Sequence, residues 1–117
     1  MFAYEIPGLR FSMPAGGAVA HRRFVAVSNG AAIQATASTP VIGASMNEVT
    51  AEEYAANDRI VEIADGIVMV EAGAAVAAGV AVEANAEGKA ITKASGTACG
   101  IAITAATEAG QLIAVKL

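Results

Sequence analysis

Short apolar segments alternate with turn-forming residues along most of this chain. From residue 21 onward the segments recur at intervals of roughly 8 to 12 residues, the spacing typical of a small β-barrel or sandwich. Their Val, Ile and Ala content favours strands over helices. The ranges expected to form strands are 24–27, 31–36, 41–44, 60–64, 67–71, 80–84, 89–93, 98–104 and 112–117.

Gly-containing turns separate several of these segments. Ser28-Asn29-Gly30 ends one expected strand, Asp65-Gly66 lies between two of them, and Glu87-Gly88 follows Asn85. Such pairs are typical of tight hairpins, because Asn, Asp and Gly tolerate positive φ angles. The Ala-rich range 72–78 contains a glycine and is expected to be a turn-rich connection.

One short helix is predicted. Thr50 and Glu53 have the spacing of a capping box, in which each side chain accepts a hydrogen bond from the backbone of the other residue. We expect the helix to run from 51 to about 57.

Residues 1–17 differ in composition from the rest of the chain. They hold Phe2, Tyr4 and Phe11 of the chain's aromatic residues, together with Pro7 and Pro14. Prolines lack a backbone donor and are poor in helices and central strands. We therefore expect an extended N-terminal arm over 1–17 and a single β-rich domain over 18–117; in the alternative, residues 2–6 form the first strand of the chain's own barrel.

The two halves of the chain show an internal repeat when aligned about Gly66. FVAVSNGAAIQATASTPVIGAS in the first half has the same order of features as VAVEANAEGKAITKASGTACGIAIT in the second. The alignment needs small gaps, and chance similarity in an Ala-rich chain is the alternative. A true repeat implies two similar β units packed as a barrel or roll. The alignment matches Val25 and Val27 with Val80 and Val82, Ile33 with Ile91, Ala37-Ser38 with Ala94-Ser95, Thr39 with Thr97, and Gly43 with Gly100.

Composition suggests that a single copy has a weak core. The chain is 56% hydrophobic but only 4% aromatic, so small side chains supply most of the apolar area. Each of them buries little surface, and oligomerisation would add stability. The net charge of -4 and the pI near 4.8 argue against nucleic acid as a partner, since phosphate binding needs clustered Lys and Arg.

The charges are unevenly distributed. Nine of the 11 acidic residues lie between residues 44 and 88, where Arg59 is the single basic residue. The flanking parts of the chain are weakly basic. This arrangement either orients neighbouring subunits or forms a solvated surface.

No motif in the sequence indicates catalysis, a cofactor or a metal. His21 is the single histidine and follows no nucleophile motif, while Cys99 is the single cysteine and is expected to be a small buried hydrophobe. The glycines fit no phosphate-binding pattern, and the acids lack the order of a calcium loop. We expect no enzyme, no small-molecule substrate and, since 24–47 is interrupted by Pro, Gly and polar residues, no membrane segment. The first residues lack a signal-peptide profile, which places synthesis in the cytoplasm.

A carrier protein is the alternative from another functional class. EAGAAVAAGVAVEA is similar to the hairpins of biotinyl and lipoyl β-rolls. Those proteins need a modifiable lysine at a hairpin tip. Lys89 is the nearby candidate, but its neighbours Gly88 and Ala90 do not fit the pattern.

The range 67–117, IVMVEAGAAVAAGVAVEANAEGKAITKASGTACGIAITAATEAGQLIAVKL, resembles the capsid cement or head-decoration proteins of tailed bacteriophages. The spacing of strands and turns, together with the repeat, predicts an all-β barrel or roll of two similar units. The resemblance implies a homo-oligomer, commonly a trimer, on the outside of the mature capsid, where it clamps neighbouring major capsid subunits. Such a protein would be made in the host bacterial cytoplasm and end in the virion. The range 46–59 lies outside this pattern, and an insertion is one interpretation of it.

The resemblance makes the N-terminal segment the candidate contact with the capsid. Aromatic and apolar anchors are enriched at interface centres, and an extended segment can add to an exposed strand of a partner. Arginines can bind carboxylates of a partner by two-point hydrogen bonds, although at residues 21–23 a solvated approach to the strand is the alternative. The candidate contacts are Phe2, Tyr4, Ile6, Leu9, Arg10, Phe11, Arg22 and Arg23.

Overall fold

The computed structural model describes residues 3–37, 39–56 and 59–117, which form nine strands and one short helix. The all-β prediction is confirmed, and every range expected to form a strand overlaps an observed one. The elements are β1 (Ile6–Pro14), β2 (Phe24–Ser28), β3 (Ala31–Gln34), β4 (Gly43–Ser45), α1 (Ala51–Ala55), β5 (Ile60–Glu71), β6 (Ala81–Ala84), β7 (Ala90–Thr92), β8 (Ala98–Ala102) and β9 (Leu112–Lys116).

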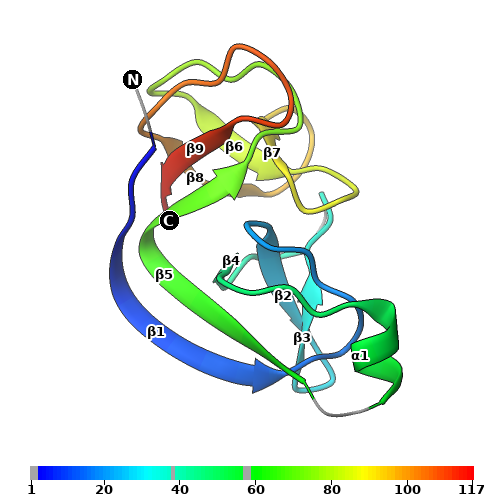
Figure 1. Ribbon diagram of the computed structural model, residues 1–117. Coiled ribbons are helices and arrows are strands. Elements are labelled where there is room, and N and C mark those ends of the chain that lie inside the picture. The colour runs from blue at the N-terminus through cyan, green and yellow to red at the C-terminus, as the bar shows by residue number, and fades with distance from the viewer. Residues whose placement is uncertain (1–2, 38, 57–58) are drawn as a thin grey trace.

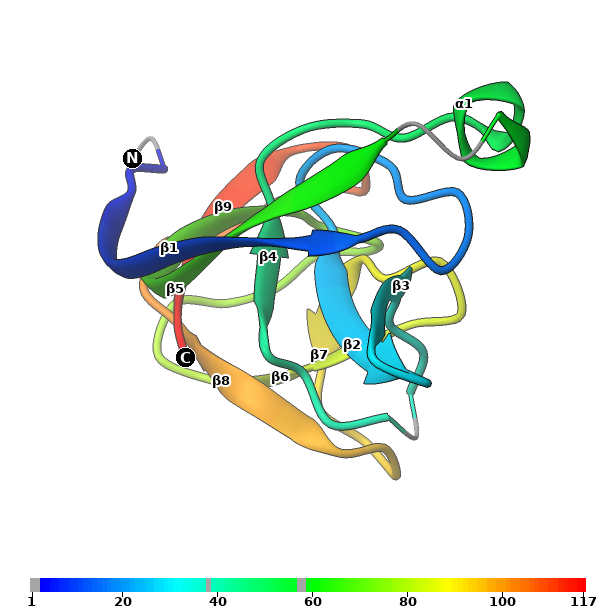
Figure 2. The same ribbon diagram turned by 90° about the horizontal axis from the view of Figure 1, so that it is seen from below.

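The strands form one curled antiparallel sheet. Its order is β3-β2-β4-β5-β9-β8-β6-β7, and β1 pairs with β5 outside this path. Figures 1 and 2 show the sheet curling into a half-open barrel, with α1 projecting at one end. The turn after β6 reaches the start of β2, where Phe24 N–H donates to Gly88 O at 2.8 Å. Thr97 N–H donates to Ala37 O at 2.9 Å and joins two further loops of the two halves.

The expected hairpin at Asp65-Gly66 is wrong, because both residues lie inside the 12-residue strand β5. Gly66 has a φ of +113°, and its N–H donates to the Asp65 carboxylate at 2.8 Å. Opposite these residues the register with β1 shifts, as at a β-bulge. The two flanking segments cannot pair with each other, since 60–64 borders β4 and 67–71 pairs with β9. The Asp-Gly pair therefore bends a strand that continues.

The other predicted turns are confirmed. Asn29 and Gly30, with φ of +52° and +76°, connect β2 to β3 as a two-residue hairpin loop. Between β6 and β7, the Asn85 carboxamide oxygen accepts from the N–H groups of Glu87 at 2.9 Å and Lys89 at 3.0 Å. These side-chain bonds add to the backbone bonds from Asn85 N–H to Lys89 O at 2.8 Å and from Gly88 N–H to Asn85 O at 3.1 Å, where the chain reverses.

The capping box of α1 is also confirmed. Glu53 N–H donates to Thr50 Oγ1 at 3.2 Å, and Thr50 N–H donates to Glu53 Oε1 at 3.1 Å. The helix ends at Ala55 with Ala56 as its C-cap, while the expected end at Asn57 lies outside the described residues. None of the residues of α1 is buried.

The internal repeat is present in the backbone pairing. Ala15 forms a parallel bridge with Ala32, as Ala72 does with Ala90, and the antiparallel bridge of Val19 to Val49 has its counterpart in Val76 to Ala106. The expected turn-rich connection over 72–78 is confirmed as part of this repeated structure. Each half thus folds in the same order of strands and bridges.

The register of the repeat differs from the sequence alignment at one strand. Val25 lies opposite Gly43 and Val82 lies opposite Gly100, so Val25 corresponds to Val82. The alignment of Val25 with Val80 was wrong by two residues. A shift of two keeps every side chain on its face of the sheet, so the Val-Ala-Val pattern could not distinguish the two alignments.

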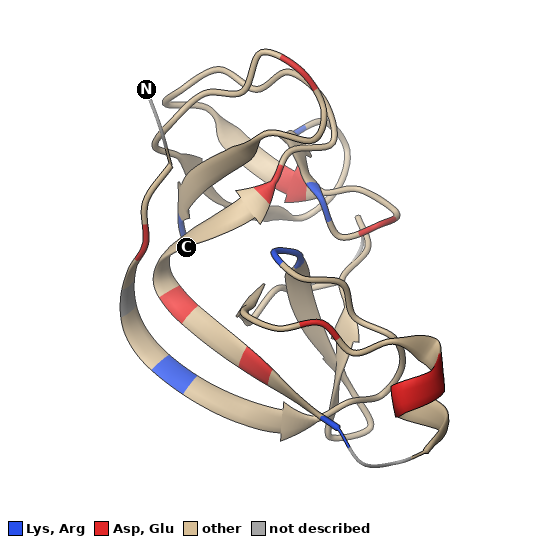
Figure 3. Ribbon diagram, in the orientation of Figure 1, with Lys and Arg blue, Asp and Glu red and all other residues tan. Residues whose placement is uncertain are grey.

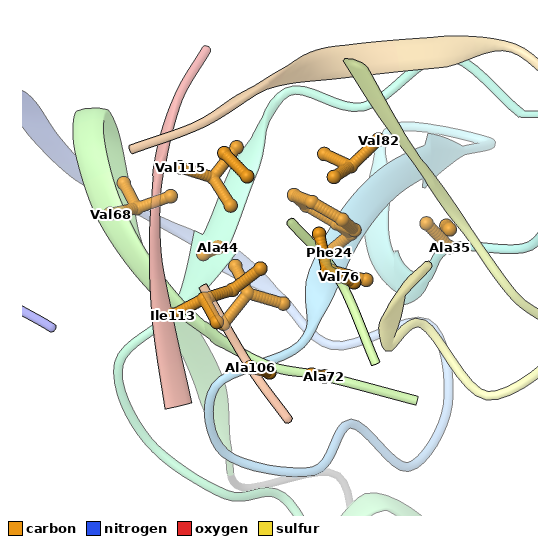
Figure 4. Packing of buried hydrophobic residues seen from close by; sticks show 14 of the residues in the cluster. Phe24, Ala35, Ala44, Val68, Ala72, Val76, Val82, Ala106, Ile113 and Val115 are labelled. Atoms are coloured by element: carbon orange, nitrogen blue, oxygen red, sulfur yellow. The ribbon is translucent and has the colours of Figure 1, made fainter. Parts of the chain in front are cut away.

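Small side chains fill the core, as composition predicted. Phe24 is the largest fully buried side chain and lies among valines and alanines from both halves (Figure 4). A second cluster contains Val19, Val25, Val49, Val61 and Ile63, against which Phe11 and Met13 of β1 pack. Strand β1 therefore covers part of the core of this domain.

Candidate functional site

Strand β1 is the open edge of the sheet. It pairs with β5 from Ile6, opposite Ile67, to Pro14, opposite Ile60, and its other side has no strand partner among the described residues. Figure 1 shows β1 following the outside of β5 over the first part of that strand. Much of the segment expected to be an arm is thus a strand of the chain's own sheet. The prolines at positions 7 and 14 fit such an edge, where fewer backbone donors are needed.

Apolar side chains are exposed along this edge. Ile6 is 60% exposed and Leu9 is 57% exposed, and Tyr4 is exposed just before the strand. Arg10 is exposed as well, whereas Phe11 is half-buried against the second core cluster. Phe2 lies outside the described residues. Four of the candidate contact residues (Tyr4, Ile6, Leu9, Arg10) therefore lie together on or beside β1.

A shallow hollow of about 180 Å³ lies beside the middle of β1. Strand β5 contributes Glu62, which is directly opposite Ser12, and Arg10 lies two residues before Ser12 in β1. Arg10 makes no ion pair within the described part of the chain. Glu62 makes none with a described residue either. Figure 3 shows a basic position on β1 and acidic positions on the neighbouring β5. The hollow is lined by Arg10, Phe11, Ser12, Met46, Glu62 and Ile63.

Arg22 and Arg23 point to carboxylates of their own chain. Arg22 Nη1 forms an ion pair with Glu5 and so fastens the segment before β1 to the turn before β2. Its backbone is in the left-handed region, with a φ of +61°. Arg23 Nη2 lies 3.2 Å from Glu71 Oε1, and its Nη1 donates to Glu87 O at 3.1 Å. These two arginines therefore bind carboxylates within their own chain, unlike the exposed residues of β1.

Glu71 joins the two halves through this network. Lys89 Nζ lies 3.2 Å from Glu71 Oε2, on the other side of the carboxylate from Arg23. Partial burial acts to raise the pKa of Glu71, but the hydrogen bonds and charges of Lys89 and Arg23 outweigh it, and the pKa lies below the ordinary 4.5. Lys89, directly before β7, is thereby held by an internal carboxylate and does not stand free at a hairpin tip, as the carrier alternative would require.

His21 and Cys99 show no arrangement for nucleophilic chemistry. His21 is exposed before β2, and partial burial followed by the charge of Arg22 lowers its pKa. Cys99 is half-buried against the core, and burial raises the pKa of its thiol. Within the described ranges, no three His, Cys, Asp or Glu side chains are placed to hold a metal ion. No helix in the described part of the chain is long and apolar enough to cross a membrane.

Sequence reasoning missed the role of Glu83, which is buried in β6. Its carboxylate accepts hydrogen bonds from the backbone N–H groups of Ala94 and, at 3.2 Å, of Gly96. The sequence indicates this role only by an acidic residue between Val82 and Ala84 in an otherwise apolar strand. This carboxylate holds the loop between β7 and β8.

Known proteins share this fold and this sequence pattern. The family model described as phage cement protein matches residues 5–117. The crystal structure of the head fiber gp8.5 N base of bacteriophage phi29 is similar with a TM-score of 0.74 and 20% identity, covering 93% of this chain and 92% of that one. No curated protein matches the chain. Since the family match spans nearly the whole sequence, the chain belongs to the phage cement protein family and is a structural protein of the phage capsid.

Proposed function

We propose that this protein is a capsid cement that binds the outside of the mature capsid and stabilises the contacts between neighbouring major capsid subunits. It acts as a homotrimer in this proposal, and the major capsid protein is its partner. The protein would be made in the host cytoplasm and occupy the capsid surface.

The open edge of β1 carries this proposal. Natural sheets usually protect their edges with charges, bulges or covering loops, because an open edge accepts another strand. Here a nine-residue edge strand exposes Ile6 and Leu9, and the bulge interrupts it at only one position. Such an edge can accept an extended segment of a capsid subunit, with Leu9 as an anchor and Arg10 as a partner for a carboxylate.

A cement protein acts by binding alone. A ligand that binds the assembled lattice but not free subunits shifts the assembly equilibrium toward the intact shell. Three copies of one edge in a trimer would bind together, so a modest affinity per edge gives strong retention. This mechanism needs none of the clustered nucleophiles, acids and bases that enzymes use.

Substitution at Leu9 tests the proposal better than deletion of the segment. Phe11 and Met13 pack against the second core cluster, so a deletion would remove core contacts as well as the edge. Leu9→Asn changes an exposed side chain and is expected to weaken binding to expanded shells by about tenfold or more. Sedimentation of fluorescent protein with expanded and unexpanded shells measures this binding.

The matched control is Val27→Asn. Val27 is 48% exposed on β2, a strand that does not pair with β1, so its substitution makes the same kind of change outside the β1 edge. We expect Val27→Asn to bind expanded shells as the wild type does. Equal weakening by both substitutions would contradict docking through β1, and equal binding of the wild type to expanded and unexpanded shells would contradict selective cementing.

A further inference from the structure

Strand β1 presents free backbone groups at two residues, Arg10 and Ser12. The residue of β5 opposite Ser12 is Glu62. Both backbone groups of Glu62 bond on the far side of β5, the N–H to Asn47 Oδ1 at 2.9 Å and the C=O to Met46 N–H at 2.8 Å. Ser12 and Glu62 are therefore a pair without mutual backbone bonds. Such pairs alternate with bonded ones in antiparallel sheets, so the N–H and C=O groups of Ser12, and of Arg10 two residues before it, point away from β5.

This free stretch of the edge is limited at both ends. On the N-terminal side the register with β5 shifts between Pro7 and Leu9. On the C-terminal side Pro14 has no N–H group, and just beyond the strand Gly16 N–H donates to Ala32 O at 2.7 Å. Between these limits β5 is the one strand that pairs with β1 within the described residues, and Figure 1 shows the outer side of β1 open. The edge therefore has room for one short extended segment over residues 9–13.

The second half of the chain shows what the outward groups bind when they are covered. In the repeat Glu71 takes the place of Pro14, because each comes directly before the residue that forms the parallel bridge. Ala72 N–H donates to Gln111 O on the side of β9, so the groups of Glu71 point the other way. There, Glu71 N–H donates to Arg22 O at 2.9 Å. A backbone carbonyl thus covers this direction in the second half, while it is open in the first.

We infer that an extended segment of the major capsid subunit adds to β1 as a further strand, bonded through the backbone N–H and C=O groups of Arg10 and Ser12. This inference rests on the proposed function and assigns the atoms and the chemistry of the docked segment. The segment carries an acidic residue opposite Arg10, since that side chain is exposed and makes no ion pair with a described residue. The next residue of the segment lies on the other face, beside the exposed Leu9, and is apolar.

A second copy of β1 matches this edge poorly. Strand β1 contains no acidic residue, so no register of two β1 edges places a carboxylate of the strand directly opposite Arg10. Pairing Arg10 with its own copy would bring like charges together, which is destabilising across strands. The chemistry of the edge therefore favours a segment of different sequence.

Ser12→Pro tests the backbone bond, and Ser12→Ala is its matched control. Proline removes the outward N–H, and Pro14 shows that β1 accepts proline at the next outward position. Alanine removes the hydroxyl group but keeps the N–H. We expect Ser12→Pro to weaken binding to expanded shells by about tenfold or more, and Ser12→Ala by less than about twofold. Circular dichroism and thermal unfolding check that both variants fold.

Hydrogen exchange of the wild type gives a second readout that needs no variant. In the free protein the amides of Arg10 and Ser12 should exchange fast and those of Phe11 and Met13 slowly, because the latter two bond to β5. Binding to expanded shells should slow the exchange of the first two. Mass spectrometry of peptides that cover residues 9–13 measures this change.

Charge reversal at Arg10 tests the acidic residue of the docked segment. Arg10→Glu is expected to weaken shell binding by about tenfold or more, because two carboxylates would then face each other. Lys93→Glu makes the same change at an exposed side chain outside β1 and should bind shells as the wild type does. Equal binding by both variants would contradict an acidic partner residue.

The outcomes separate this inference from the proposed function. Shell binding without slower exchange over residues 9–13, or equal shell binding by Ser12→Pro and the wild type, would overturn the inference and leave the cement function standing. A wild type that binds no shells would overturn both. Slower exchange that appears without shells and increases with protein concentration would show that a second copy occupies the edge, and would also overturn the inference.

Discussion

Gly43 and Gly100 occupy the same place in the two halves, and at both the neighbouring strand passes against the glycine backbone. A Cβ atom on Gly43 would stand 2.5 Å from Ala64 O, and one on Gly100 would stand 2.3 Å from Lys116 O. Both distances are far inside van der Waals contact with backbone atoms that cannot rotate away. Glycine at these two positions allows β4 and β8 to pack against β5 and β9.

We expect Gly43→Ala and Gly100→Ala each to lower the free energy of unfolding by about 2 kcal/mol or more, since the added methyl group forces two strands apart. Thermal or urea unfolding followed by circular dichroism measures the loss. Gly17→Ala is the matched control, because no atom lies within 4 Å of an added Cβ there. A loss at Gly17 as large as at the other two glycines would contradict this explanation.

The carboxylate of Glu71 should make stability depend on pH. Its pKa is lower in the folded protein than the ordinary 4.5, so the ionised form favours folding. This contribution is fully present above about pH 4.5 and is lost as the pH falls through the folded pKa. Urea unfolding at a series of pH values from 7 downward measures it.

Glu71→Gln is the comparison for this pH dependence. It should cost roughly 1 to 2 kcal/mol at pH 7, between the values for exposed and buried ion pairs, because Arg23 and Lys89 lose their shared partner. Below pH 4.5 the difference from the wild type should shrink. A difference that stays constant down to low pH would contradict the assignment, since the two proteins differ only at position 71.

Glu83 should be required for the loop between β7 and β8. Glu83→Ala removes a buried acceptor of two backbone N–H groups, and we expect a loss of about 2 to 4 kcal/mol together with faster hydrogen exchange at Ala94 and Gly96. Glu83→Gln retains one acceptor oxygen and should lose less. Unchanged exchange at both amides in Glu83→Ala would show that other contacts hold the loop.

Much of the fold could be predicted from local signals. Three of these signals act through their own side chains or φ angles: Asn29-Gly30, the Asn85 turn and the Thr50 capping box. The interactions that form these structures are therefore visible in the local sequence. The Asp65-Gly66 pair is also a local signal, but it does not by itself determine whether the chain turns back or only bends. The pairing of β5 with β1, β4 and β9 decides this, and those strands are distant in sequence.

The candidate site was predicted in part. Exposed apolar residues at positions 4, 6 and 9 do lie together at an edge, but the pairing of β1 with β5 depends on a partner about 50 residues away and could not be inferred from prolines and aromatics. The carboxylates that hold Arg22 and Arg23 are likewise 17 and 48 residues away in sequence. Such distant pairs leave no local pattern.

Strand β5 belongs to both halves of the chain. Its residues 63 and 64 pair with β4 and its residues 67–71 pair with β9, while β1 runs beside the first part and reaches the second only at Ile67. Because this one strand contributes to both halves, unfolding of either half removes a strand from the other, and the two halves should unfold together in one cooperative transition. A mechanical force applied to either half would be transmitted to the other along the continuous backbone of β5.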